Sequence, residues 1–156
     1  MSLVKLPRMS SEEVEALLNK QFMCRIAFNG GDYPYLAPFR YVRIADVLYF
    51  HFTDYGKKMR LIAQDDRACV QIESYTPDLS EYNFVSLRGR LVKVEDPDEV
   101  ERAVRLFAET GKDSISPKFL AAHGFDPGAG WDIFKGDLVI IKLVDIVEKV
   151  GLKSPD

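Results

Sequence analysis

Two adjacent lysines, Lys57 and Lys58, follow a glycine at the point where a strand-like pattern gives way to a helical one. Backbone N–H groups at the start of a helix lack intrahelical acceptors, and the helix dipole is positive there. Lysine is disfavoured at that position on dipole grounds, so its presence favours a nearby anion. The segment therefore predicts an anion site, and a phosphorylated ligand is its most specific form.

The strand expected just before these lysines, over Val47–Thr53, adds polar groups at the same place. Strand side chains alternate between two faces, which puts His51 and Thr53 on one face and Phe52 on the other. Phosphate oxygens readily accept charge-assisted hydrogen bonds from such donors. From local pattern alone, a second interpretation stays open: a solvated strand end followed by a basic helical turn.

Two further strand segments carry residues suited to a flat or an anionic ligand. Between Tyr35 and Tyr41, a proline and several aromatic residues can shelter a planar ring, or the segment can be an ordinary strand with Arg40 in solvent. In the strand expected over Asn83–Glu95, Ser86 shares a face with Arg88. That face suits an anion, a partner subunit or solvent.

The bulk properties predict one soluble domain, spanning residues 1–156. A chain of 156 residues that is 47% hydrophobic and 29% charged can bury its own core. A net charge of −3 argues against nucleic acid as a partner, because binding its backbone needs a basic surplus. Without a secretory or membrane-spanning run, a cytoplasmic protein with no membrane contact is expected. No metal or catalytic motif is recognised, so no metal site and no catalytic residue are predicted.

About six strands and three or four short helices must position these groups. Helices are expected after a capping box at Ser10, over Lys57–Gln64, from Pro97 and from Pro117. Short turns between successive strands favour an antiparallel sheet that begins with a three-stranded meander, and closure into a small barrel would remove exposed edges. A bend or bulge is expected at Gly89. The predicted strands are Phe22–Phe28, Tyr35–Ile44, Val47–Thr53, Arg67–Ser74, Asn83–Glu95 and Asp137–Lys149.

The order and spacing of five stretches resemble those of a known family. The stretches are Cys24–Phe28, Tyr35–Phe39, Leu48–Lys58, Ala68–Glu73 and Tyr82–Asp96. Together they are similar to the FMN-binding split-barrel superfamily, pyridoxamine 5′-phosphate oxidase-like, and most of all to its branch with nitroimidazole-resistance proteins. The resemblance implies a mainly β fold, a six-stranded antiparallel split β-barrel of the FMN-binding type with short flanking helices.

The resemblance also implies a homodimer with FMN at the subunit interface. It places the cofactor phosphate on the segment from His51 to Lys58 and the isoalloxazine ring along the strand from Pro38 to Tyr41, mainly through backbone contacts. Ser86 and Trp131 are placed near the cofactor, with Ser86 reaching the partner's flavin. The implied cofactor-binding residues are Pro38, Phe39, Arg40, Tyr41, His51, Phe52, Thr53, Lys57, Lys58, Ser86 and Trp131.

For activity, the resemblance implies flavin-dependent reduction of a small nitro- or quinone-like molecule, with NAD(P)H as the candidate electron donor. The C-terminal arginine-and-histidine substrate signature of true pyridoxamine phosphate oxidases is not found, so vitamin B6 oxidation is not expected. A fold does not fix its chemistry, and two alternatives stay open. One is a non-enzymatic FMN carrier or redox sensor; the other is a split barrel that binds deazaflavin or haem.

Overall fold

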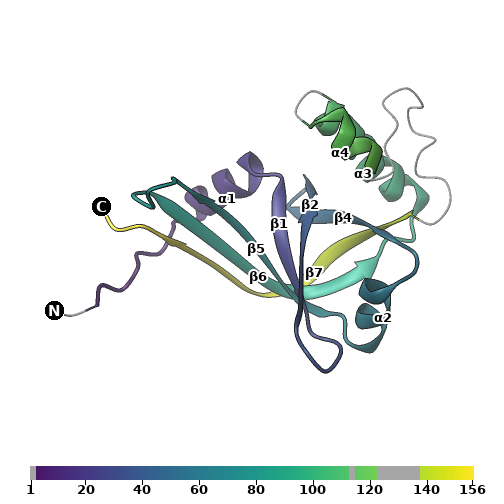
Figure 1. Ribbon diagram of the computed structural model, residues 1–156, viewed down its shortest axis with the longest axis horizontal. Helices are drawn as coiled ribbons and strands as arrows, with labels where there is room; N and C mark the ends of the chain where they lie inside the picture. Colours follow the sequence, from purple (N-terminus) through teal and green to yellow (C-terminus); the bar gives the residue numbers. More distant parts are fainter. Residues whose placement is uncertain (1–2, 113–114, 123–137) are drawn as a thin grey trace.

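The residues that the structure describes form one curled antiparallel sheet of seven strands with helices around it (Figure 1). The computed structural model describes residues 3–112, 115–122 and 138–156. Neighbouring strands follow the order β2-β1-β5-β6-β7-β4-β3. The strands are β1 (Met23–Phe28), β2 (Tyr35–Arg40), β3 (Val42–Ile44), β4 (Val47–Thr53), β5 (Arg67–Tyr75), β6 (Tyr82–Lys93) and β7 (Leu138–Lys153).

The sheet has seven strands rather than the predicted six because the expected strand over Tyr35–Ile44 is divided at Tyr41. Its first half, β2, pairs with β1, and its second half, β3, pairs with β4. The expected meander is therefore wrong, since β2 and β3 are the two edges of the sheet. Because residues next to each other in the chain occupy both edges, the sheet must curl, and the predicted split-barrel fold is confirmed.

Tyr41 leaves the strand ladder because both of its polar groups find partners elsewhere. Its backbone N–H donates to the Phe22 carbonyl at 2.9 Å, and its hydroxyl donates to the Leu18 carbonyl at 2.7 Å. The ring is buried in the barrel core. Burial also raises the pKa of this phenol, so the hydroxyl stays a donor at neutral pH.

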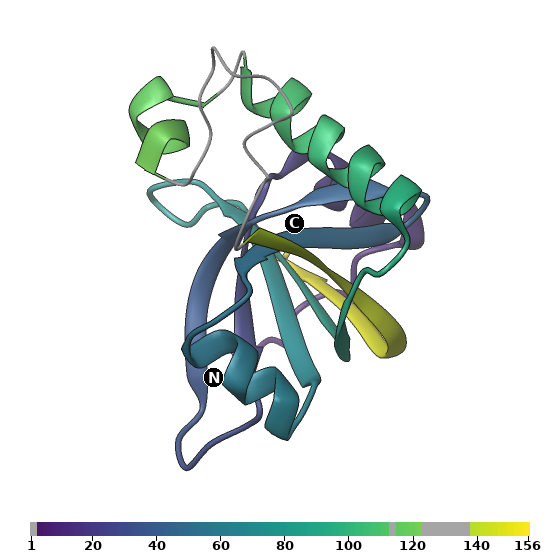
Figure 2. The same cartoon turned by 90° about the vertical axis from the view of Figure 1, so that its right-hand side faces the viewer.

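Four helices flank the sheet in the described residues: α1 (Ser11–Lys20), α2 (Lys57–Gln64), α3 (Pro97–Lys112) and α4 (Pro117–Ala122). The predicted capping box at Ser10 is present, with Glu13 as its reciprocal partner. The predicted bounds of α2 agree with the structure. Figure 2 shows α3 lying across one side of the sheet, with α2 on the other side.

β4 has a hydrophobic layer on each of its faces, which is why it can hold the site described below. Leu48, Phe50 and Phe52 point into the barrel core. Tyr49 belongs to a second cluster, which packs under α3 and includes Phe107. The side chains of β4 are thus fixed from both sides by packing.

The bulge expected at Gly89 is confirmed by a register shift between Arg88 and Arg90 in the pairing of β6 with β7. A Cβ at Gly89 would lie 2.5 Å from the Val144 carbonyl oxygen, so only glycine allows this approach. β7 continues to Lys153, beyond the predicted end at Lys149.

Candidate functional site

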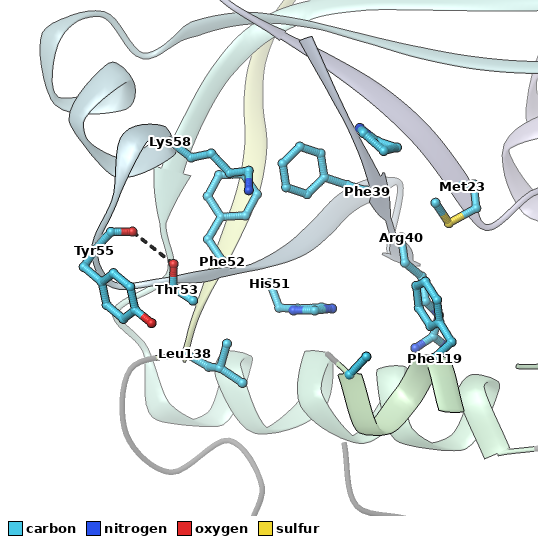
Figure 3. Close-up of a pocket in the computed structure, with 12 residues that line it drawn as sticks. Met23, Phe39, Arg40, His51, Phe52, Thr53, Tyr55, Lys58, Phe119 and Leu138 are labelled. Atoms are coloured by element: carbon cyan, nitrogen blue, oxygen red, sulfur yellow. Dashed lines mark hydrogen bonds between the residues drawn. The ribbon is translucent and has the colours of Figure 1, made fainter. Parts of the chain in front are cut away.

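A pocket of about 530 Å³ opens where β2, β4 and α4 meet near the start of α2 (Figure 3). Its walls come from segments far apart in the sequence. Among the described lining residues there is no aspartate or glutamate, whereas an arginine, a lysine and a histidine are present. The lining residues are Met23, Pro38, Phe39, Arg40, His51, Phe52, Thr53, Tyr55, Lys58, Phe119, Ala122 and Leu138.

The start of α2 forms the first cationic end of the pocket. Gly56 occupies the N-cap position of α2 with a φ of 93°, and no side chain forms a capping hydrogen bond there. The first turn of the helix contains no acidic residue. The half-buried Lys58 holds its Nζ 5.3 Å from the centroid of the Phe39 ring. Since the helix supplies no anion for its own N–H groups, this end suits an external anion such as a phosphate.

Thr53 and Tyr55 complete this end of the pocket. The Thr53 hydroxyl donates to the Tyr55 carbonyl at 3.0 Å. Its proton is therefore engaged, and its oxygen can accept a further hydrogen bond. Thr53 lies opposite Leu138 in the pairing of β4 with β7. Donation from the Thr53 hydroxyl to a phosphate would require this local bond to be exchanged.

Aromatic side chains form the wall next to the first cationic end. Phe39 and Phe52 have ring centroids 4.8 Å apart with an interplanar angle of 31°. Pro38, exposed on β2, has no backbone N–H to donate. This wall is apolar and broad enough to contact a planar ring.

Arg40 forms the second cationic end, on the side of the pocket away from Lys58 (Figure 3). Only 6% of its surface is exposed. Its Nη2 donates to Thr110 Oγ1 at 2.6 Å, and its guanidinium carbon lies 5.3 Å from the centroid of the Phe107 ring. Burial lowers the pKa of Arg40 to about 10, which leaves it charged at neutral pH. The expectation of a solvent-facing Arg40, kept open from the sequence, is therefore wrong.

His51 lies between the two ends, half-buried on the face of β4 that α3 covers. Its ring meets the Phe107 ring edge-on, with centroids 5.1 Å apart and an interplanar angle of 88°. Phe107 thus contacts both His51 and Arg40, and it fixes the positions of two polar residues of the pocket.

A hydrogen-bond network holds α3 against β4 and β7. Glu99 Oε1 accepts hydrogen bonds from the Tyr49 hydroxyl and from Lys142 Nζ, each at 2.8 Å. The bond from Lys142 lowers the pKa of Glu99. Burial raises the pKa of Tyr49 to about 12. The carboxylate of Glu99 on α3 therefore joins this helix to β4 and to β7.

Of the eleven residues predicted from the sequence, seven line this pocket, three described residues do not, and Trp131 is not among the described residues. Tyr41 is turned into the core. Lys57 is exposed and places its Nζ 4.5 Å from the centroid of the Tyr35 ring. Ser86 Oγ lies 3.1 Å from Cys69 Sγ in the pairing of β5 with β6. The cofactor contacts of all eleven stay predictions.

Local sequence patterns missed five lining residues: Met23, Tyr55, Phe119, Ala122 and Leu138. Tyr55 lies inside the predicted phosphate segment and could have been included. Phe119 and Ala122 come from α4, far along the chain from the strands they face, and no local pattern signals that approach. Among the described residues, no cluster of side chains is suited to a metal ion. None of the described helices combines the length and apolarity needed to cross a bilayer.

Comparison with known proteins gives one family match. The family model for pyridoxamine 5′-phosphate oxidase matches residues 10–121, which is more than half of the chain. That match covers the strands and helices that form most of the pocket. Among proteins with curated functions, none matches the sequence.

Several crystal structures are similar in fold at low sequence identity. An FAD-binding protein from Mesorhizobium loti is 19% identical, with a TM-score of 0.66 over 97% of this chain and 100% of that chain. A protein from Bacteroides thetaiotaomicron assigned to 5-nitroimidazole antibiotic resistance is 17% identical, with a TM-score of 0.66 over 97% and 92%. An FAD-binding protein from Mycobacterium smegmatis is 13% identical, with a TM-score of 0.62 over 94% and 97%. At these identities the likeness concerns the fold.

Proposed function

The chain belongs to the pyridoxamine 5′-phosphate oxidase family, and on this basis we propose that it is a flavoprotein that binds FMN in the pocket between Lys58 and Arg40. The observation that carries the proposal is an aromatic wall beside a helix start with a lysine and no acidic group. Proteins of similar fold from Mesorhizobium loti and Mycobacterium smegmatis are described as FAD-binding, which supports a flavin.

The residues of the pocket fit a flavin that carries a single phosphate. Lys58 and the first N–H groups of α2 would hold the phosphate, with Thr53 beside them. Phe39 would contact the isoalloxazine ring, with the buried ring of Phe52 packed behind it, and the backbone from Pro38 to Arg40 would lie along the flavin. A bound flavin supplies hydride and single-electron transfer, which no amino-acid side chain of the pocket offers.

The proposed activity is reduction of a small quinone- or nitro-like acceptor by a reduced nicotinamide nucleotide. For a quinone, NAD(P)H and one proton are consumed, and NAD(P)⁺ and the hydroquinone are produced. The protein's contribution is to bind and orient both reactants and to exclude water, through the walls that β2, β4 and α4 give the pocket. No side chain is assigned as a catalytic residue.

The active form is proposed to be a homodimer that uses the outer face of β1, β2 and β5. Large apolar side chains are exposed there: Met23 at 38%, Leu36 at 61% and Tyr75 at 59%. Met23 and Pro38 line both the pocket and a neighbouring hollow of about 220 Å³ on that face. A second copy seated on the face would therefore close the open side of the pocket. Sedimentation of the flavin-loaded protein as a monomer would overturn this.

A carrier or redox sensor would use the same pocket without turnover. The observation that favours it is that the described lining contains no aspartate or glutamate, and therefore no carboxylic acid that could donate a proton to an acceptor. Turnover of NAD(P)H with quinone, nitro or azo acceptors separates the two functions. A carrier would bind flavin and leave NAD(P)H unoxidised.

The test of flavin binding is the absorption spectrum of the purified protein and its uptake of added FMN. A flavin spectrum that stays with the protein through gel filtration supports the proposal, and mass spectrometry of the released ligand identifies it. A Soret band would indicate haem, and a deazaflavin would be recognised by its mass. Colourless protein that takes up no FMN would overturn the proposal.

A further inference from the structure

Arg40 is a buried cation without a counterion in the described part of the chain. Its Nε and Nη1 have no hydrogen-bond partner there, although only 6% of the residue is exposed. These two atoms carry three of the five N–H bonds of a guanidinium. Thr110 and Phe107 engage the rest of the group, but neither is an anion.

Burying an unpaired charge is costly, so such a group usually has a partner that the isolated chain does not contain. Arg43, three residues away, shows how the same fold neutralises another arginine, although its Nε also lacks a hydrogen-bond partner among the described residues. It pairs with Glu15 and, at 3.0 Å, with Asp46. Arg40 has no such carboxylate among the described residues, and it lines the pocket. The missing partner is therefore expected to enter with a ligand.

The flavin phosphate is poorly placed to be that partner. The phosphate site is assigned to Lys58, Thr53 and the start of α2, and Figure 3 shows Arg40 on the opposite side of the pocket. Figure 3 draws Phe119 of α4 toward the same side of the pocket, and its ring adds a second apolar surface to the lining. A molecule bound at this side would thus meet one cation and an aromatic side chain.

We propose that Arg40 binds an anionic group of the electron acceptor, and that the acceptor is therefore a planar aromatic molecule carrying a carboxylate or a similar anion. This inference rests on the proposed function, because it names the substrate class of the same pocket. Charge-assisted hydrogen bonds from Nε and Nη1 would hold the anion, and Phe119 would contact the ring. Arg40 is thus the residue that determines which acceptors bind.

The experiment compares two probes of nearly the same shape: 4-nitrobenzoate, which is anionic, and 4-nitrobenzamide, which is neutral. Binding to the FMN-loaded protein is followed by the change in flavin absorbance, and binding to flavin-free protein by calorimetry. We expect the wild type to bind the anion at least about tenfold more tightly, which is the lower end of what charge-assisted hydrogen bonds provide. Equal affinities for the two probes would overturn the proposal.

Two variants test whether Arg40 causes the preference for 4-nitrobenzoate over 4-nitrobenzamide. Arg40→Met should abolish the tenfold preference for the anion, whereas Lys20→Met should retain it. Lys20 is the matched control, because it removes one positive charge from a neighbouring hollow of about 280 Å³ that Arg40 also borders. A preference that survives Arg40→Met, or that disappears in Lys20→Met, would overturn the assignment to this pocket.

The anion that pairs with Arg40 could belong to the acceptor or be the flavin phosphate. Titrations with FMN and with riboflavin, which lacks the phosphate, distinguish the two. If Arg40 serves the acceptor, Arg40→Met changes the affinity for both flavins to a similar extent. A selective loss of FMN affinity would assign Arg40 to the flavin phosphate and overturn the proposal. Failure of the proposed function would appear separately, as no uptake of either flavin by the wild type. Methionine fills the volume of the buried arginine without a charge, so the variant is expected to fold, as unfolding curves will check.

Discussion

The guanidinium of Arg40 rests against the backbone of α3 at Gly111, where a Cβ would lie 3.2 Å from Nη1 and 3.4 Å from Nη2. Glycine within a helix costs about 1 kcal/mol relative to alanine. The helix thus carries a destabilising residue at the point where the buried cation needs room. A side chain at position 111 would therefore crowd the guanidinium of Arg40.

Gly111→Ala should therefore weaken binding of 4-nitrobenzoate, because the added methyl group displaces the guanidinium. Its effect on the free energy of unfolding should stay within about 1 kcal/mol, since improved helix propensity offsets the tight contact. Titration and chemical unfolding measure the two effects. In an Arg40→Met background the same change should leave probe affinity unaltered. An equal loss of affinity in both backgrounds would show that Gly111 does not act through Arg40.

Tyr41→Phe should destabilise the protein by about 1–2 kcal/mol and leave FMN affinity unchanged. The buried hydroxyl donates to the Leu18 carbonyl, which would lose its partner at the end of α1. Tyr33→Phe is the matched control, since Tyr33 is 85% exposed and outside the pocket lining, and it should change stability by less than about 0.5 kcal/mol. Denaturant unfolding and flavin titration test both variants. A large loss of FMN affinity in Tyr41→Phe alone would show that the Tyr41 hydroxyl does contribute to cofactor binding.

Glu99→Gln should lower stability at neutral pH by about 1–3 kcal/mol, because Lys142 loses a charged partner. The hydrogen bond from Lys142 lowers the pKa of Glu99 in the folded protein. The ionised Glu99 therefore contributes to the free energy of unfolding at pH values above its unfolded-state pKa of about 4.3. This contribution is lost as the pH falls through the lower pKa of Glu99 in the folded protein. The stability difference between wild type and variant should shrink below about pH 4.

Unfolding curves at pH 7 and at pH 3.5 measure this difference. Glu101→Gln serves as the control, because Glu101 pairs with Arg105 on the exposed face of α3 and should contribute little at either pH. A Glu99→Gln penalty that is the same at both pH values would contradict the assigned ion pair.

The sequence predicted the local elements well where capping and alternation are strong. The bounds of β4 and α2 agree with prediction because Gly56 ends one pattern and a helical pattern begins at Lys57. The bulge at Gly89 was predictable because a glycine inside a long strand commonly marks a bulge or a close backbone approach. By contrast, nothing in the alternation from Tyr35 to Ile44 indicates that pairing changes partners at Tyr41.

The cationic end at Arg40 was harder to predict than the end at Lys58. Lys58 follows its glycine closely, so one short segment carries the signal. The burial of Arg40 depends on Phe107, Thr110 and Gly111, which lie about seventy residues later, as the separation of Arg40 from Thr110 shows. Such tertiary packing leaves no trace in the strand itself, and an arginine there was equally compatible with solvent.

Lys57 and Lys58 give the sharpest test of whether this pocket holds the phosphate of FMN. Lys58 lines the pocket, whereas Lys57 lies over the Tyr35 ring outside the lining, so the pair forms its own matched control. Titration of wild type, Lys58→Ala and Lys57→Ala with FMN and riboflavin gives the affinities. We predict that Lys58→Ala weakens FMN binding by about 1.5–3 kcal/mol and leaves riboflavin binding unchanged, while Lys57→Ala changes neither by more than about 0.5 kcal/mol. Unchanged FMN affinity in Lys58→Ala, or equal losses for FMN and riboflavin, would show that Lys58 does not hold the phosphate.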